Sequence, residues 1–384
     1  MSHLIISKKN EVYLHVDAEV HIYYELADQF TFDVPGATFS PAYKKKYWDG
    51  KIRLFSTQTG DIYVGLLDRV IQFCKDHGYT YEFLESKYYG TPFEVNEMNS
   101  KEGVKDYMTA ISKHKPRDYQ IEGVYDALRH NRKLLISPTA SGKSLMIYSI
   151  VRYFVEQQKN TLIVVPTTSL VEQMHKDFAS YGWDADSYCQ KIYAGREKES
   201  KCPVVITTWQ SIYKLPKTYF ERFEVVVGDE AHQFKSASLV KIMTKLHTAK
   251  YRYGFTGTLD GTQTHKLVLE GLFGPSYKTI KTHELMEKGY LAKLNAKIIL
   301  LQHNPVCFDT YEDEITDYIV DNFGSEMLVE LFSNNEGNLR GYKNDLVWTY
   351  IEMIASTIIE EYEDVTCQEL SEDDEELITS YMVS

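Results

Sequence analysis

An octapeptide suited to binding phosphate, SPTASGKS, occupies residues 137–144. It follows a short apolar run and precedes a helical pattern, so backbone N–H groups and the positive end of the helix can surround a polyphosphate. Gly142 lets the backbone approach, Lys143 reaches the β and γ oxygens, and Ser144 offers a hydroxyl to Mg²⁺. Ser137 stands where the G-x-x-x-x-G-K-[ST] pattern has its first glycine. The loop residues assigned to ATP binding are Pro138, Thr139, Ala140, Ser141, Gly142, Lys143 and Ser144.

Two adjacent carboxylates follow another apolar run, 224–227, in the segment Gly228-Asp229-Glu230-Ala231-His232. A carboxylate at a strand end can hold the magnesium that bridges the β and γ phosphates, and a second can activate water. We assign Asp229, with Ser144, to the metal and Glu230 to the base, and Lys143 completes the catalytic set. Either motif alone could be an ordinary turn, but both on one sheet favour a nucleotide site.

The surrounding pattern alternates apolar strands with amphipathic helices. Strands are expected at 133–136, 161–165, 204–207, 224–227 and 251–255, and helices at 143–157 and 169–181. Near-continuous Val, Ile and Leu content is what strands buried on both faces need. The sequence therefore predicts an α/β fold with a doubly wound, mostly parallel sheet.

Three zones divide the chain. Residues 1–112, rich in Tyr and Phe, predict a small α/β domain with a helix ended by Gly78. Residues 113–304 carry the alternating pattern and the phosphate loop. Residues 305–384 form an acidic tail with helical segments at 310–320 and 345–362.

The net charge of -13 is unevenly distributed. Residues 301–384 hold 21 Asp and Glu against Arg340 and Lys343 only, a net of -19 that leaves +6 on residues 1–300. The body can therefore accept a polyanion. The acidic tail is either a solvated end or a mimic that competes with nucleic acid for the basic body.

Several classes of protein are disfavoured. The five cysteines contain no Cys-x-x-Cys pair and the twelve histidines lack metal-ligand spacing, which argues against a disulfide framework and a zinc site. No apolar run reaches the roughly 20 residues of a membrane span, and the start resembles no secretory signal, so a cytoplasmic protein is expected.

An aromatic and basic segment at residues 43–53, YKKKYWDGKIR, predicts nucleic-acid binding. Its cations can neutralise phosphates while an aromatic ring stacks on an exposed base. The alternative is a solvated hairpin with Trp48 packed inward. The candidate DNA-binding residues here are Lys44, Lys45, Lys46, Tyr47, Trp48, Lys51 and Arg53.

Residues 229–232 spell DEAH, and together with SPTASGKS they closely resemble the first, RecA-like lobe of superfamily 2 helicases. Further matches lie in order between residues 117 and 258. The resemblance implies that Gln120 contacts the adenine and Arg117 helps to place the nucleotide. It also implies contact with the nucleic-acid backbone by Thr167, Thr168, Thr208 and Gln210, and coupling of hydrolysis to lobe movement by His232, Thr256 and Thr258.

More narrowly, the chain is similar to the UvsW-type recombination helicases of T4-like phages, which carry a small N-terminal domain with a Trp-Asp-Gly segment, here at 48–50. This likeness implies ATP-driven remodelling of branched DNA and DNA–RNA hybrids in the cytoplasm of the host cell. Such motors need a second lobe with arginines, and only 83 residues follow Leu301. We expect an incomplete second lobe whose function is supplied by a separate chain, or a truncated product.

Three interpretations follow. The first is an ATP- and Mg²⁺-dependent DNA helicase component. The second is a nucleotide-responsive DNA-binding module without motor activity. The third is an RNA helicase fragment, since lobe-one motifs mostly touch backbone rather than bases.

Overall fold

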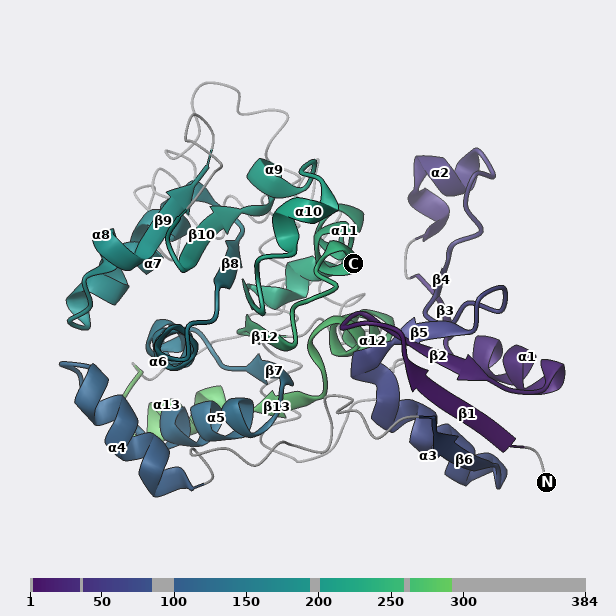
Figure 1. The fold of residues 1–384 in the computed structure, drawn as a ribbon, viewed down its shortest axis with the longest axis horizontal. Helices are drawn as coiled ribbons and strands as arrows, with labels where there is room; N and C mark the ends of the chain where they lie inside the picture. Colours follow the sequence, from purple (N-terminus) through teal and green to yellow (C-terminus); the bar gives the residue numbers. More distant parts are fainter. Residues whose placement is uncertain (1–2, 35–36, 85–99, 194–200, 259–262, 292–384) are drawn as a thin grey trace, which may run out of the picture. The chain divides into compact units, whose positions relative to one another are not determined.

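The computed structural model describes residues 3–34, 37–84, 100–193, 201–258 and 263–291 (Figure 1). Residues 1–282 form one compact unit and residues 283–384 a second. The predictions for 305–384, with the helices at 310–320 and 345–362, lie outside the described residues. No helix in the described ranges is long and apolar enough to cross a membrane.

A seven-stranded, wholly parallel sheet carries the phosphate loop (Figure 1). Its strand order is β13-β7-β12-β11-β8-β10-β9. The strands are β7 (Arg132–Ile136), β8 (Thr161–Val165), β9 (Cys189–Ile192), β10 (Val204–Thr208), β11 (Val225–Asp229), β12 (Tyr251–Thr256) and β13 (Ser276–Lys278). This sheet confirms the predicted fold class.

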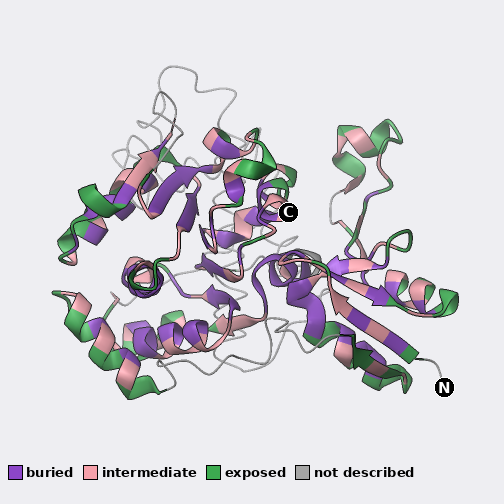
Figure 2. Ribbon diagram, in the orientation of Figure 1, coloured by how far each residue is buried: buried purple, intermediate pink, exposed green. Residues whose placement is uncertain are grey.

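Helices cover both faces of this sheet, because successive side chains of a strand point to opposite sides. Leu135 and Ile163 pack with the helices α4 to α7, whereas Leu134 and Leu162 pack with η3, α11 and α12. The strands β8, β10 and β11 are accordingly buried along their whole length (Figure 2). The helices are α4 (Lys101–Ile111), α5 (Asp118–Arg129), α6 (Lys143–Glu156), α7 (Thr168–Ser180), α8 (Ala185–Tyr188), α9 (Trp209–Ile212), α10 (Lys217–Phe220), η3 (Ala231–Lys235), α11 (Ala237–Lys245), α12 (Gln263–Phe273) and α13 (Thr282–Glu287).

The N-terminal part contains a four-stranded sheet of order β5-β2-β1-β6 and a separate β3-β4 hairpin. Its helix α3 ends at His77 with Gly78 in the left-handed region, φ 69°, which confirms the predicted glycine stop. The elements are β1 (His3–Lys8), β2 (Tyr13–Asp17), α1 (Val20–Gln29), β3 (Thr31–Asp33), η1 (Ala37–Phe39), α2 (Pro41–Lys44), β4 (Lys51–Arg53), β5 (Asp61–Tyr63), η2 (Val64–Leu66), α3 (Leu67–His77) and β6 (Thr80–Phe83).

The N-terminal part packs tightly on the larger sheet through a continuous apolar core. A Cβ on Gly65 would lie 2.0 Å from the carbonyl oxygen of Glu270 in α12, so only glycine fits this approach. An ion pair of 2.8 Å joins Glu11 to the buried Arg132 at the start of β7. The two parts therefore share one packed interior.

Two edge strands, β9 and β13, were not predicted. Each has three or four residues, and β9 is half polar, so neither carries an apolar run that a sequence pattern could reveal. The domain boundaries at 112 and 304 stay predictions.

Candidate nucleotide-binding site and nucleic-acid surface

The phosphate loop occupies the turn between β7 and α6, at the carboxyl edge of the sheet. Gly142 caps the helix with φ 79°, and a Cβ there would lie 2.3 Å from Nε2 of Gln120. Ala140 also adopts the left-handed region, φ 63°, where an L side chain is strained. This alternation of backbone conformation is the kind that turns successive N–H groups toward an anion.

Ser137 stands where the sequence pattern has its first glycine, and it stabilises the loop through hydrogen bonds. Its backbone N–H donates to the carbonyl of Thr256 at 2.8 Å, and its Oγ lies 2.7 Å from Oγ of Ser141. Both serines are fully buried. The departure from the sequence pattern is thus compatible with a formed loop.

The two carboxylates at the end of β11 differ in environment. Burial raises the pKa of Asp229 to about 6, and the charge of Glu230 acts in the same direction. Hydrogen bonding from His232 and the ion pair with Lys143 lower the pKa of Glu230 to about 2. Nζ of Lys143 lies 2.8 Å from Oε1 of Glu230. The fold thus brings the loop lysine to the acidic pair across 87 residues of sequence.

These residues fit a magnesium nucleotide. A buried carboxylate with a raised pKa is an oxygen ligand whose ionised form a divalent cation would stabilise. A side chain at Gly142 would collide with Gln120, which explains the glycine at this position of the loop. Gly257 approaches the loop closely as well, since a Cβ there would lie 3.7 Å from Oγ1 of Thr139 and 3.8 Å from Nζ of Lys143. Asp229 and Ser144 carry hard oxygen atoms that could hold the metal, and Lys143 carries a cation that could pair with phosphate.

The coupling residues form a connected chain. Oγ1 of Thr256 donates to the carbonyl of Thr258 at 2.7 Å and lies 3.0 Å from Nδ1 of His232. Because the single hydroxyl proton of Thr256 goes to Thr258, Nδ1 of His232 is the donor to Thr256. Nδ1 also lies 3.4 Å from Glu230, so His232 links Glu230 to Thr256 at the end of β12.

Gln120, expected to read adenine, is turned onto the phosphate loop in this structure. Its Oε1 accepts from the backbone N–H of Arg117 at 2.9 Å, and its Nε2 donates to the carbonyl of Ser141 at 2.8 Å. Tyr119, which sequence reasoning did not single out, donates to that same carbonyl at 2.8 Å and accepts from Nη1 of Arg117. Its position inside the Arg-Asp-Tyr-Gln segment was the available signal.

The predicted backbone contacts lie at the carboxyl ends of β8 and β10, which are neighbours in the sheet. Thr167 caps α7 through its side chain, and Thr168 beside it is exposed. Gln210 is exposed, whereas Thr208 is 4% exposed and its hydroxyl lies 2.9 Å from that of Ser211. The candidate phosphate and metal residues follow β7 and β11 of the same parallel sheet, so the same edge carries both sets.

The aromatic and basic segment forms the tip of the N-terminal part. Tyr47 is 85% exposed and follows Lys46, whose φ is 57°. Nε1 of Trp48 donates to the carbonyl of Lys51 at 2.9 Å, which holds the indole against the hairpin. Arg53 pairs with Asp49 of the same segment. These side chains line a hollow of about 850 Å³ with Thr38, Tyr43 and Lys44.

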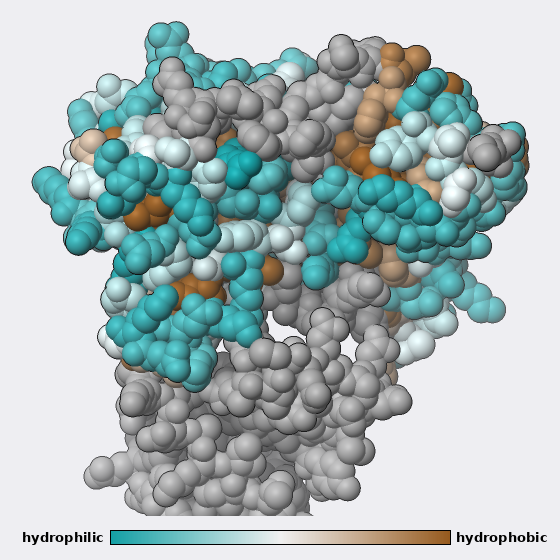
Figure 3. Space-filling view, turned by 90° about the horizontal axis from the view of Figure 1, so that it is seen from below, coloured by the Kyte–Doolittle hydropathy of each residue, from teal (hydrophilic) through white to brown (hydrophobic). Residues whose placement is uncertain are grey.

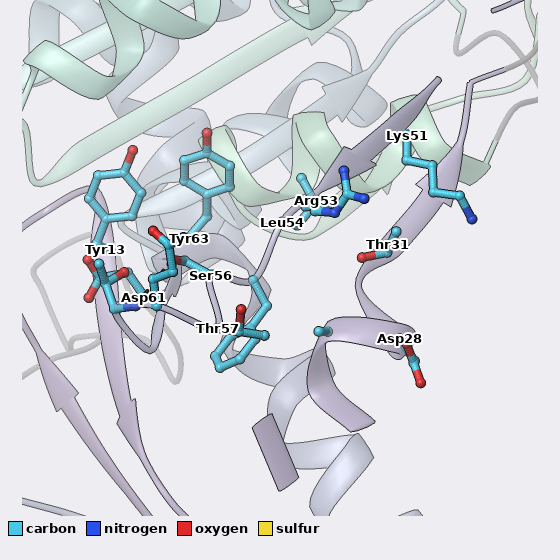
Figure 4. Close-up of a pocket in the computed structure, with 14 residues that line it drawn as sticks. Tyr13, Asp28, Thr31, Lys51, Arg53, Leu54, Ser56, Thr57, Asp61 and Tyr63 are labelled. Carbon is cyan, nitrogen blue, oxygen red and sulfur yellow. Dashed lines mark hydrogen bonds between the residues drawn. The ribbon is translucent and has the colours of Figure 1, made fainter. Parts of the chain in front are cut away.

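A second hollow, of about 790 Å³, is also lined by Arg53. Figure 4 shows Tyr13 and Tyr63 side by side at one end and Lys51 and Arg53 on the hairpin strand. The two tyrosine rings stack with centroids 5.4 Å apart. Figure 3 shows a largely hydrophilic described surface with scattered apolar patches.

The parallel sheet with a phosphate loop at its carboxyl edge defines a RecA-like lobe. Two family models match the chain: the res subunit of type III restriction enzymes over residues 113–261, and the N-terminal domain of the DNA helicase UvsW over residues 6–83. The ATP-dependent DNA helicase uvsW of Enterobacteria phage T4 is 31% identical over 324 residues, which cover 79% of this chain and 62% of that protein. The chain belongs to the UvsW-type superfamily 2 helicases.

Other matches agree. The DNA 3'-5' translocase XPB2 of Sulfurisphaera tokodaii is 29% identical over 53% of this chain and 45% of its own length. A crystal structure of the UvsW helicase from bacteriophage T4 has a TM-score of 0.64 at 29% identity, covering 72% of this chain and 99% of that one. Another T4 UvsW structure, at 22% identity and a TM-score of 0.63, covers 93% and 78% and supports the fold. The chain thus spans less than two thirds of the two curated relatives.

Proposed function

We propose that this chain binds Mg·ATP and DNA as a component of a helicase that remodels branched recombination and replication intermediates. The observation that carries the proposal is the contact of 2.8 Å between Lys143 and Glu230, beside the buried Asp229. Phosphoryl transfer uses a lysine that binds phosphate, a ligand that holds the metal and a base that activates water. The three residues proposed for these roles lie at one edge of the sheet.

The ion pair suggests how the residues divide the work. Lys143 leaves Glu230 to bind the terminal phosphates, and this raises the pKa of Glu230 from about 2 toward its ordinary value of 4.5. Glu230 then orients water and accepts its proton. Asp229 and Ser144 hold Mg²⁺, which when bound neutralises charge on the phosphate oxygens. Gln120 would contact the adenine, which requires it to leave Ser141, and Arg117 would help to place the nucleotide.

DNA binding is assigned to two regions. Lys44, Lys45 and Lys46 with Lys51 and Arg53 neutralise phosphates, while Tyr47 or Trp48 stacks on an unpaired base. Thr167, Thr168, Thr208 and Gln210 follow the backbone at the edge of the larger sheet. Full turnover would also need arginines of the kind that a second lobe supplies, which contribute about 10³ to 10⁵ in rate where measured.

Phosphate release in the presence of branched DNA tests the proposal. We expect DNA-stimulated hydrolysis that Lys143→Ala abolishes. Lys105→Ala is the matched control, because Lys105 pairs with Glu102 on the surface of α4 and should leave turnover unchanged. DNA binding without hydrolysis, even beside an arginine-bearing lobe, would instead identify a nucleotide-responsive binding module. Stimulation by RNA alone would indicate an RNA helicase fragment.

Replacing Lys44, Lys45 and Lys46 by Ala tests the DNA surface separately. Each lost phosphate contact should flatten the salt dependence of affinity by about 0.9 on a log–log plot for duplex DNA. A variant with the slope of the wild type would remove this segment from the interface.

A further inference from the structure

A chain of buried hydroxyl groups lies beneath the phosphate loop. Oγ1 of Thr279 has a single proton, which it donates to Oγ of Ser137 at 3.0 Å, and it also lies 3.2 Å from the carbonyl oxygen of Ile136. Oγ of Ser137 in turn lies 2.7 Å from Oγ of Ser141. Both serines are 0% exposed and Thr279 is 8% exposed. Buried hydroxyls that bond one another in this way are fixed in place, since each would otherwise lose its water partners without compensation.

Ser141 is the member of this chain that belongs to the loop itself. It lies between Ala140 and Gly142, both of which have left-handed backbones. Its hydroxyl is held by Ser137, and its carbonyl accepts from Tyr119 and Gln120 at 2.8 Å each. The orientation of this residue therefore determines where the following N–H groups point, and these are the groups that would face a phosphate.

Thr279 contributes to this arrangement with its side chain alone. It lies just after β13, and its backbone N–H donates to Ile136 at 2.9 Å independently of the hydroxyl. Removal of the hydroxyl thus leaves the pairing of the strand in place. Thr279 is 142 residues from Ser137 in sequence, so only the tertiary structure joins them.

We propose that Thr279 is a positioning residue for nucleotide binding, acting through Ser137 on the conformation of Ser141. The proposal rests on the ATP-binding function proposed above. The hydrogen bonds between these hydroxyls constrain the loop at Ser137, the position where the usual sequence pattern has a glycine. Loss of the Thr279 hydroxyl should make the phosphate loop more mobile in the nucleotide-free protein.

Amide hydrogen exchange on the nucleotide-free full chain tests the inference without relying on ATP. In Thr279→Val we expect the amides of residues 139–145 to exchange about 5- to 10-fold faster, the size expected for one lost hydrogen bond. Thr279→Ser keeps the hydroxyl and should exchange like the wild type. Thr161→Val is the matched control, since Thr161 is buried in β8 and its hydroxyl has no hydrogen-bond partner among the described residues. Unchanged exchange in Thr279→Val would overturn the proposal.

Equilibrium titration with ATP and Mg²⁺ gives a second readout. Thr279→Val should bind about 5- to 10-fold more weakly, and Ser137→Ala should show a similar loss. The double variant should lose no more than either single one, because both break the same chain; additive losses would contradict it. If the wild type binds no ATP, the proposed function fails, while the exchange experiment still decides the role of Thr279.

Discussion

The raised pKa of Asp229 predicts that this residue lowers the stability of the folded chain, although we expect it to be needed for hydrolysis. Asp229 is 7% exposed, so its carboxylate is ionised at neutral pH although little water surrounds it. A pKa of about 6 in place of the ordinary 3.8 corresponds to about 3 kcal/mol at 1.36 kcal/mol per pKa unit. Asp229→Asn removes this penalty, and the amide oxygen can still accept from the backbone N–H of Glu230, now at 3.0 Å.

We therefore expect Asp229→Asn to raise the free energy of unfolding of the nucleotide-free protein by about 1 to 3 kcal/mol at pH 7.5. The attraction to Lys143 lowers the pKa of Asp229 and is already included in the value of about 6. The sign follows from proton binding: between pH 3.8 and about 6 the folded chain keeps a proton on Asp229 that the unfolded chain has released, so stability falls as pH rises through this window. The advantage of the variant should grow over that window and stay constant above it.

Thermal denaturation at pH 4.5 and 7.5 measures this difference, at roughly 2 to 4 °C per kcal/mol for a domain of this size. Asp184→Asn is the control, because this exposed residue caps α8 and asparagine caps equally well. The same Asp229→Asn protein should show no magnesium-dependent hydrolysis. The reasoning would be refuted by a variant that is no more stable than the wild type at pH 7.5, or by one that still hydrolyses ATP.

Three further predictions concern packing and the two candidate surfaces. Gly65→Ala should lower the free energy of unfolding, measured in urea, by much more than the roughly 1 kcal/mol expected for Gly78→Ala. A Cβ on Gly65 would lie 2.0 Å from Glu270, whereas a Cβ on Gly78 would meet open space and cost only backbone strain. Equal losses in the two variants would argue against the close approach at Gly65. Tyr47→Ala should weaken single-stranded DNA binding by about 1 to 3 kcal/mol in fluorescence anisotropy without a change in Tm, since the ring is 85% exposed; unaltered affinity would exclude stacking by this ring. Ala140→Val should weaken ATP binding at least about tenfold because a β-branched residue adopts the left-handed backbone poorly, while Ala140→Gly should retain binding.

Much of the fold could be predicted because burial leaves a local trace. The strands β7, β8, β10, β11 and β12 are apolar runs that fill the middle of the sheet, and each was expected within one or two residues of its bounds. Gly78 likewise predicted the end of helix α3, because glycine readily adopts the left-handed backbone that ends a helix. The edge strands β9 and β13 left no such trace, since an edge strand needs no continuous apolar sequence.

The sequence by itself determined which residues stand at the strand ends, because glycine, lysine and carboxylate motifs are local and the parallel sheet brings such ends to one edge. Only the tertiary structure decided the partners. The pairing of Lys143 with Glu230, the turn of Gln120 onto the loop and the bond from Thr279 to Ser137 each depend on which distant segments become neighbours. Short-range periodicity records whether a side chain is buried, whereas the identity of its neighbour is set by the order of strands in the sheet, which no local pattern contains.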